Sequence, residues 1–258
     1  MCTLSWAASG SSYQLFFNRD EQRTRQPALP PEIITHDGVS ALMPVDPQGG
    51  GSWISVNEYG LGLCLLNFYQ GRTPSGSLTS RGQLLRSLAC LPTISEVSGH
   101  IYNTRLTNYA PFTLVVFQPV FSKTSPATAI TYFQWDGQSL SKGKPNSPLT
   151  SSSVDFNVVS GCRYNRYTEQ VVHHTPLELV DYHRSHDGEK NHRSVCMHRD
   201  DAKTVSLSHI TLSGQTASFH YQPGSPCENM PGETSSITVR RYDSSSSEFS
   251  FSEIESTV

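Results

Sequence analysis

A cysteine stands directly behind the first methionine of the chain, as Cys2. Methionine removal is efficient when the second residue is small, so we expect Cys2 to become the N-terminal residue of the mature protein. A terminal cysteine combines a thiol, with a reference pKa of about 8.5, and an α-amine, with a reference pKa of about 7.7–8.0. The amine can take the thiol proton and later protonate a leaving group, which predicts nucleophilic acyl chemistry at Cys2.

A polar tetrapeptide, NRDE at residues 18–21, ends a run of β-prone residues. If that run pairs as a hairpin with the strand that begins at Cys2, the tetrapeptide returns beside the chain start. We then expect Arg19 to favour the thiolate, and either Asp20 or Glu21 to accept a hydrogen bond from the α-ammonium. A solvated loop with a local salt bridge is the alternative for the tetrapeptide taken alone.

Asn67 follows the apolar run GLGLCLL at residues 60–66. An amide side chain just beyond a buried strand can donate a hydrogen bond to the negative charge that develops during acyl transfer. One such donor lowers the barrier by on the order of 3 kcal/mol. Asn67 is therefore a candidate oxyanion donor, and a turn residue that ends a strand is the alternative.

Five features together resemble the NRDE family, which includes the transport-and-Golgi-organisation proteins. They are Met-Cys at the start, the NRDE tetrapeptide, a Gly-Gly-Ser-Trp turn that ends at Trp53, Asn67 after the next strand, and a helix led by Ser-Arg-Gly at residues 80–82. The resemblance covers residues 1 to about 91, with a weaker echo at residues 109–117.

That family is in turn similar to the N-terminal nucleophile hydrolases, especially bile-salt hydrolases and penicillin V acylases. The resemblance implies hydrolysis of a non-peptide C–N bond through an acyl-Cys2 intermediate. It also implies catalytic or supporting positions, namely Cys2, Arg19, Asp20 and Asn67 for catalysis, and Asn18, Glu21, Trp53 and Ser151 for support or substrate binding. Because the arginine and the acid are spaced differently in the two families, the corresponding acid stays open between Asp20 and Glu21.

One segment departs from the pattern of the related families. The acylases carry Leu-Thr-Asn-Ser and NRDE proteins carry Ser-Asn-Ser, whereas this chain reads LTSSS at residues 149–153. If these segments correspond, Ser151 replaces the asparagine with a shorter donor. The change is compatible with a different substrate, or with a site that binds without turnover. The resemblance implies a second hypothesis, because some relatives of the NRDE type are associated with secretory organisation and with lipid or haem handling: the protein is a carrier or adaptor that keeps the site for binding.

Strands must position most of these residues. Apolar alternation between turn residues predicts where the strands lie. The predicted strands are near residues 2–6, 13–17, 52–56, 60–66, 112–117, 130–135, 194–197, 204–211 and 216–221. Apolar spacing and capping residues predict three helices, at 80–91, 95–104 and 175–183. We expect a loop over 27–51, and the segment 154–172 stays open between helix and strand.

Helices grouped between runs of strands favour an α+β domain over a doubly wound parallel sheet. With the resemblance, this predicts a four-layer αββα sandwich with two antiparallel sheets between helix layers. We expect one domain over residues 1–242, followed by a Ser-rich tail at 243–258.

The overall composition limits the classes of partner. The formal net charge is −3 without a block of Lys or Arg, which argues against a nucleic-acid partner. No apolar stretch reaches the roughly 20 residues needed to span a bilayer, and the N-terminus lacks the features of a signal peptide. We therefore expect a cytoplasmic protein that takes a small acyl substrate or ligand and needs no cofactor. The sequence leaves the oligomeric state open.

Cysteine and histidine spacing does not predict a metal site. The six cysteines form no CxxC pair, and without an export signal we expect reduced thiols. Several histidines cluster in the second half of the chain, at 173, 174, 183, 186, 192 and 198, without an HExxH motif. The glycines at 49–51 match no phosphate-binding pattern, so we expect them to let the chain pass close to another backbone.

Overall fold

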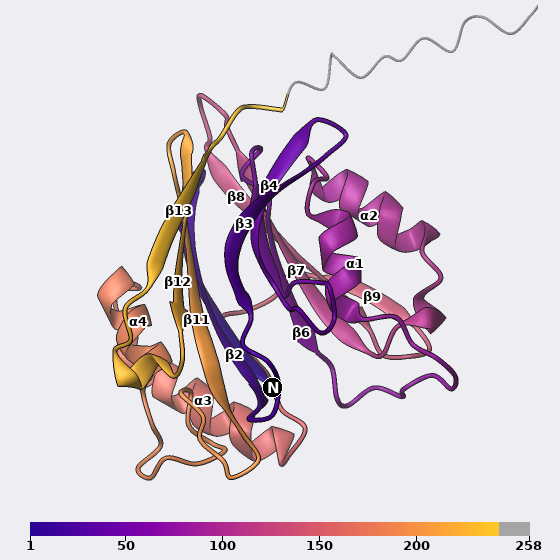
Figure 1. Ribbon diagram of the computed structural model, residues 1–258. Coiled ribbons are helices and arrows are strands. Elements are labelled where there is room, and N and C mark those ends of the chain that lie inside the picture. The colour runs from indigo at the N-terminus through magenta and orange to yellow at the C-terminus, as the bar shows by residue number, and fades with distance from the viewer. Residues whose placement is uncertain (243–258) are drawn as a thin grey trace, which may run out of the picture.

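The structure, a computed structural model, describes residues 1–242. Two antiparallel sheets pack face to face, and a pair of helices covers the outer face of each (Figure 1). This arrangement confirms the predicted αββα sandwich. The expected tail, 243–258, lies outside the described residues.

The first sheet has the strand order β10-β1-β2-β11-β12-β13. Its strands are β10 (Leu149–Ser151), β1 (Cys2–Ser9), β2 (Ser12–Gln22), β11 (Ala202–Ser213), β12 (Thr216–Pro223) and β13 (Glu233–Thr238). The expected hairpin of β1 and β2 is confirmed, and its register places Cys2 opposite Arg19. Gly10, with φ 57°, makes the turn of this hairpin, in a backbone region that glycine adopts without strain.

The second sheet has the order β3-β4-β5-β6-β7-β8-β9. Its strands are β3 (Leu29–His36), β4 (Val39–Val45), β5 (Ile54–Asn57), β6 (Gly62–Asn67), β7 (Phe112–Val120), β8 (Ala127–Trp135) and β9 (Leu140–Gly143). The expected loop over 27–51 was wrong, because it contains β3 and β4. The prolines at 30 and 31 are tolerated because β3 is an edge strand, and the ladder shifts register between Leu29 and Glu32.

The helices are α1 (Arg81–Leu88), α2 (Ile94–Asn103), α3 (Phe156–Gln170) and α4 (Pro176–Arg184), with short 3-10 turns η1 (Leu106–Asn108) and η2 (Pro226–Glu228). The three predicted helices are present, and α4 begins with the expected capping box between Thr175 and Glu178. The open segment 154–172 is helix α3. The strand expected at 194–197 was wrong, since this stretch forms bends in the connection between α4 and β11.

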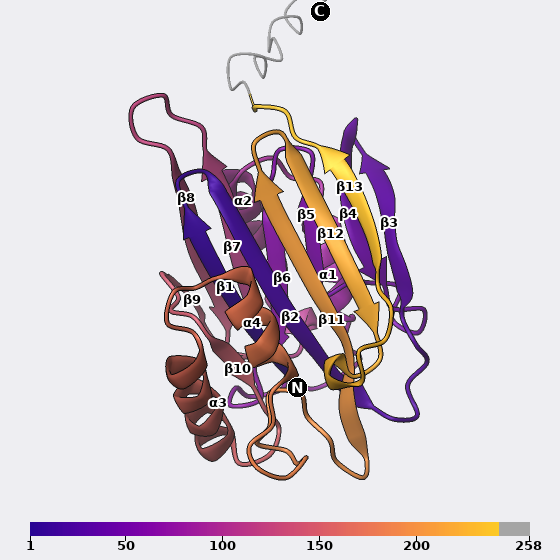
Figure 2. The same cartoon turned by 90° about the vertical axis from the view of Figure 1, so that its left-hand side faces the viewer.

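Three apolar clusters hold the layers together. The largest lies between the sheets and contains Cys2, Leu4, Phe17 and Val115 among others. A second packs α1 and α2 on the second sheet, and a third packs α3 and α4 on the first sheet (Figure 2). None of the helices within residues 1–242 is long and apolar enough to cross a membrane.

Candidate active site

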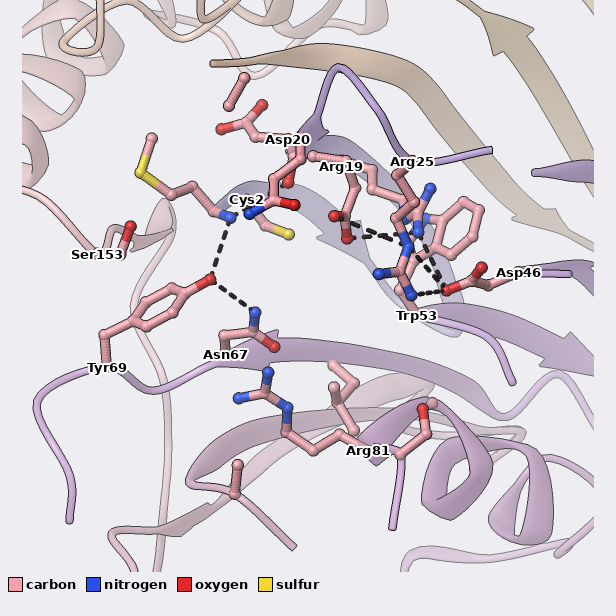
Figure 3. A pocket seen from close by; sticks show the side chains of 18 of the residues that line it. Cys2, Arg19, Asp20, Arg25, Asp46, Trp53, Asn67, Tyr69, Arg81 and Ser153 are labelled. Atoms are coloured by element: carbon pink, nitrogen blue, oxygen red, sulfur yellow. Dashed lines mark hydrogen bonds and ion pairs between the residues drawn. The ribbon is translucent and has the colours of Figure 1, made fainter. Parts of the chain in front are cut away.

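A cavity of about 660 Å³ opens at the end of the sandwich where β1 begins. Of the eight residues predicted for the site, six line it, namely Cys2, Arg19, Asp20, Glu21, Trp53 and Asn67. Figure 3 shows these side chains, which come from both sheets. The cavity therefore brings together most of the predicted residues, although several have partners that the sequence did not indicate.

The NRDE tetrapeptide is part of β2, so its side chains alternate between the two faces of the first sheet. Arg19 and Glu21 face the cavity between the sheets. Asn18 points to the helix layer, where its amide donates to the carbonyl oxygens of His183 (2.8 Å) and Val195 (3.0 Å). Asn18 is thus buried behind the sheet and does not line the cavity, and its role in supporting the site or binding substrate stays a prediction.

Arg19 belongs to an ion-pair cluster with a residue of its own strand and with residues of the connections that follow β2 and β4. Its Nη2 lies 3.3 Å from both Asp46 Oδ2 and Glu21 Oε1. Arg25 also pairs with Asp46, and the Arg19 guanidinium lies 4.4 Å from the centre of the Trp53 ring. Arg19 is thus bound by two carboxylates and an aromatic face, which fixes its position but shares its charge with partners other than Cys2.

Burial opposes the ionisation of Asp46, but a hydrogen bond from Arg25 and the charge of Arg19 outweigh it. The pKa of Asp46 is therefore lowered. The sequence did not identify Arg25 and Asp46, because Asp46 lies in the range 27–51, which was expected to be a loop, and Arg25 lies just before it.

Asp20 is held on the opposite face of β2 by a fully buried arginine from α3. Arg163 Nη2 lies 3.5 Å from Asp20 Oδ2, and Arg163 Nη1 donates to Thr3 Oγ1 at 2.6 Å. The hydroxyl of Thr204 donates to the other oxygen of Asp20 at 2.6 Å. The Asp20 carboxylate is thus a structural anchor for the ends of β1, β2 and β11, and sequence reasoning missed Arg163 because its segment had no clear helix pattern.

Cys2 is almost completely buried, with an exposed fraction of 8%. Met1 covers it and is buried to the same extent. The Met1 ammonium donates to the backbone carbonyl of Asp20 at 3.2 Å and to the Tyr69 hydroxyl at 3.5 Å. The Met1 carbonyl accepts from the backbone N–H of Asp20 at 2.9 Å. With Met1 in place, the N-terminal ammonium therefore binds a backbone carbonyl and the Tyr69 phenol, and not the carboxylate that the sequence predicted.

Burial raises the pKa of the Cys2 thiol to about 11, although the Met1 ammonium and the Asp20 backbone N–H act in the opposite direction. Below that pH the thiol is neutral, so with Met1 in place we expect about one thiol in a thousand to be ionised at pH 8. The rate of alkylation of Cys2 by iodoacetamide should rise about tenfold per pH unit from pH 7 to pH 10. Mass spectrometry of the Cys2 peptide measures this rate, and a plateau below pH 9 would contradict the raised pKa.

Asn67 and Tyr69 form a hydrogen-bonded pair on the floor of the cavity. The Asn67 amide donates to the Tyr69 hydroxyl at 2.8 Å, and that hydroxyl also accepts from the Met1 ammonium. Figure 3 shows both side chains directed toward Cys2. The Asn67 amide thus lies near Cys2. If Met1 is absent, the Tyr69 hydroxyl loses one of its two partners, and the pair of Tyr69 and Asn67 can then rearrange.

The start of α1 is held at the cavity by a close approach of two backbones. A Cβ on Gly51 would lie 2.1 Å from the Gly82 carbonyl carbon, and the Ser52 N–H donates to Gly82 O at 3.1 Å. This confirms the expectation that the glycine run lets the chain pass close to another backbone. The contact places Arg81, which sequence reasoning treated only as part of a helix start, on the wall of the cavity.

Arg81 forms no ion pair with the described residues, and its Nη1 donates to the Pro111 carbonyl at 2.9 Å. Burial lowers its pKa, and the opposing effects of Tyr69, Cys2 and the Glu21 carboxylate do not compensate for the lost solvation. Figure 3 shows its guanidinium beside Asn67. The other arginines that line the cavity within residues 1–242 are paired with carboxylates, so Arg81 is the arginine there whose charge can be offered to a ligand.

Ser151 pairs with Cys2 across the β10–β1 ladder. Directly opposite residues share a face of the sheet with Cβ atoms about 4.5–5.5 Å apart. Ser151 is buried and does not line the cavity, and its hydroxyl has no hydrogen-bond partner within the described chain. Ser151 thus lies next to Cys2 in the sheet but outside the cavity lining, and its correspondence to the acylase asparagine stays a prediction.

The comparisons with known proteins agree with this architecture. The family model described as Transport and Golgi organisation 2 matches residues 1–244. No curated protein matches the sequence. Among solved structures, an arginine-to-leucine variant of conjugated bile acid hydrolase from Clostridium perfringens matches with a TM-score of 0.50 and 14% identity, covering 94% of this chain and 97% of that one. At this identity the likeness concerns the fold.

Two further solved structures are less similar. A cysteine-to-alanine mutant of the same conjugated bile acid hydrolase matches with a TM-score of 0.48 and 15% identity, over 92% of each chain. The Caenorhabditis elegans orthologue of N-acylethanolamine-hydrolysing acid amidase matches with a TM-score of 0.44 and 10% identity, over 80% of this chain and 92% of that one.

Proposed function

This chain belongs to the Transport and Golgi organisation 2 family, and from that premise we propose that it is a cysteine N-terminal nucleophile hydrolase for a non-peptide C–N bond. The observation that carries the proposal is the position of Cys2. It is the first residue of β1, and it lines a cavity beside Arg19 and Asn67. Acyl transfer needs a nucleophile and a hydrogen-bond donor for the oxyanion in a cavity that can hold a substrate. Cys2 would be the nucleophile here, and the Asn67 amide the donor.

Removal of Met1 is the first step of the proposed mechanism. It would uncover the thiol, create an α-amine on Cys2 and release the Asp20 N–H and the Tyr69 hydroxyl from their present partners. The space that Met1 fills would become part of the cavity. These changes turn a closed site with a neutral thiol into an open site with a base attached to the nucleophile.

In the reaction, the Cys2 amine takes the thiol proton and the thiolate attacks the acyl carbon of the amide. The negative charge that develops on the acyl oxygen is stabilised by the Asn67 amide. The C–N bond then breaks as the ammonium returns the proton to the leaving amine. Water, deprotonated by the α-amine, attacks the thioester, which releases a carboxylic acid and restores the thiol.

The test compares the protein lacking Met1 with the protein that retains it, obtained by inhibiting methionine aminopeptidase in the expression host. Intact mass identifies each form, and both are incubated with a panel of N-acyl amides and lactones. We expect turnover only in the form that lacks Met1. Retention of Met1 in the normally produced protein, or equal turnover in both forms, would contradict the mechanism.

A carrier or adaptor function is the second candidate, and the structure with Met1 in place favours it. Met1 is buried, its ammonium is hydrogen-bonded, and the Cys2 thiol has a raised pKa. A protein that kept Met1 would retain a polar cavity without an activated nucleophile. Saturable binding of an acyl compound without turnover, in a protein whose mass includes Met1, would establish this alternative.

The uncompensated charge of Arg81 predicts that the substrate carries an anionic group. Replacing Arg81 by Gln should raise KM for such a substrate about 10- to 100-fold, because a charge-assisted contact contributes roughly 1.5–3 kcal/mol. The variant Arg86→Gln, on the same helix but outside the cavity lining, serves as the control and should behave like the wild type. Steady-state kinetics with an anionic substrate and its neutral amide or ester measures the effect. Equal losses for both substrates would contradict a contact with the anion.

Ser151 offers a test of the proposed correspondence with the acylase asparagine. The variant Ser151→Asn extends a donor toward the side of Cys2, where the serine hydroxyl has no partner. We expect kcat to rise about three- to tenfold, since a second oxyanion donor adds part of the roughly 3 kcal/mol that one donor contributes. Ser153→Asn, on the cavity wall, is the control. Unchanged kcat in a folded Ser151→Asn protein would remove this position from the proposed site.

A further inference from the structure

A second group of reactive side chains lies outside the cavity, behind the wall formed by the connection between α4 and β11. Two histidines and two cysteines converge there, namely His186, Cys196, His198 and Cys227. Three come from the connection and Cys227 comes from η2, after β12. One ligand atom from each residue lies within 4.8 Å of all the others. Side chains from two separate segments thus meet at one point.

Two of the distances within this group match those of a metal site. His198 Nε2 lies 3.6 Å from Cys196 Sγ and 3.3 Å from Cys227 Sγ. A tetrahedral zinc with ligand bonds of about 2.0–2.3 Å has ligand-to-ligand edges of about 3.3–3.8 Å. These two distances match such edges, and the other ligand atoms, which lie within 4.8 Å of one another, would draw closer to surround one ion.

An unsatisfied polar atom in the same group also points to a ligand. The Nε2 atom of His186 is shielded from solvent and has no hydrogen-bond partner within residues 1–242. A buried polar atom without a partner carries a desolvation cost. Its imidazole ring lies 5.5 Å from that of His198, centre to centre. A metal bond to His186 Nε2 would offset this cost.

We propose that His186, Cys196, His198 and Cys227 form a structural zinc site. Zinc in structural sites prefers four tetrahedrally arranged ligands, and two histidine nitrogens with two thiolates are one of its usual donor sets. Four protein ligands leave no open position, so the site would stabilise structure and perform no catalysis. Metal binding displaces the two thiol protons. The Lys190 ammonium lies 3.9 Å from Cys227 Sγ and would stabilise the negative charge of that thiolate without touching the metal.

The position of the site connects it to the cavity. Cys196 and His198 flank Met197, which lines the cavity and packs against Met1. Arg199 and Asp201, further along the same connection, line the cavity as well. Zinc would join this connection to η2 and so hold one wall of the cavity in place. Loss of the metal should therefore loosen the wall without removing Cys2 or Asn67.

The test uses the full chain, purified under reducing conditions and freed of metal, with Co²⁺ as the probe. We expect one ion per chain, a thiolate-to-cobalt charge-transfer band in the near ultraviolet and the intense visible bands of tetrahedral cobalt. Zn²⁺ should displace Co²⁺ stoichiometrically. The variants Cys196→Ser and Cys227→Ser should each weaken Co²⁺ binding at least 100-fold and reduce the charge-transfer band. Cys162→Ser, a partly exposed cysteine outside the group, is the matched control and should bind like the wild type.

The spectrum of the unmodified protein decides the question even if a serine variant fails to fold. No thiolate-to-cobalt band in the reduced wild type would overturn the proposal. A Cys196–Cys227 disulfide in protein isolated with thiols blocked at lysis, without bound zinc, would also overturn it and assign the pair to a covalent link. Equal loss of Co²⁺ in Cys162→Ser would contradict the choice of ligands.

Discussion

Replacing Cys2 by Ala is expected to lower kcat at least about 1,000-fold, because removing the nucleophile of a covalent mechanism eliminates the reaction path. Alanine is also small, so we expect Met1 to be removed in the variant as in the wild type. The α-amine then remains, and the comparison isolates the thiol. The free energy of unfolding should change by about 1–2 kcal/mol or less, since only one buried sulfur is lost.

Turnover of an N-acyl amide measures this prediction, with intact mass to confirm the state of Met1. Cys90→Ala is the matched control, because Cys90 is also a buried free cysteine but packs under α1 and α2, away from the cavity. It should keep wild-type kcat. Equal turnover in wild type and Cys2→Ala would remove Cys2 from the mechanism, whatever the effect on stability.

Replacing Arg163 by Met is expected to lower the free energy of unfolding by about 3–5 kcal/mol. The side chains of Arg163 and Asp20 are 0% and 1% exposed, so the variant leaves a buried carboxylate without its counter-charge. It also removes the donor to Thr3. The double variant Arg163→Met with Asp20→Asn should recover part of the loss, because it removes both buried charges.

Urea unfolding followed by circular dichroism measures these free energies. Arg240→Met is the control, because Arg240 also pairs with a carboxylate, Glu58, but its side chain is 54% exposed. Because its arginine reaches solvent, this partly exposed pair should contribute only about 0–1 kcal/mol. A loss below about 1 kcal/mol for Arg163→Met, similar to the control, would show that the buried pair does not anchor the ends of β1 and β2.

Local pattern predicted the parts of the fold that depend on neighbours in sequence. The β-prone runs at 2–6 and 13–17 suggested the hairpin of β1 and β2, and hence the position of Arg19 beside Cys2. Capping residues predicted α4. By contrast, β3 was missed because two prolines argue against a strand, and only its edge position makes them acceptable.

Contacts between layers could not be read from the sequence. Arg19 meets Asp46 and Trp53 because of the way the two sheets stack, and no local pattern encodes that packing. Arg163 and the group around His198 likewise join segments far apart in the chain. The sequence therefore predicted which residues gather at the cavity better than it predicted their partners.

The most direct test of the central claim is the mass of the protein during turnover. The protein is mixed with an N-acyl amide that it hydrolyses, quenched in acid and analysed intact and after proteolysis. The proposed mechanism predicts loss of Met1 and one acyl group per chain, located on Cys2 and lost again as substrate is exhausted. Retained Met1, or an acyl group on any other residue, would contradict it.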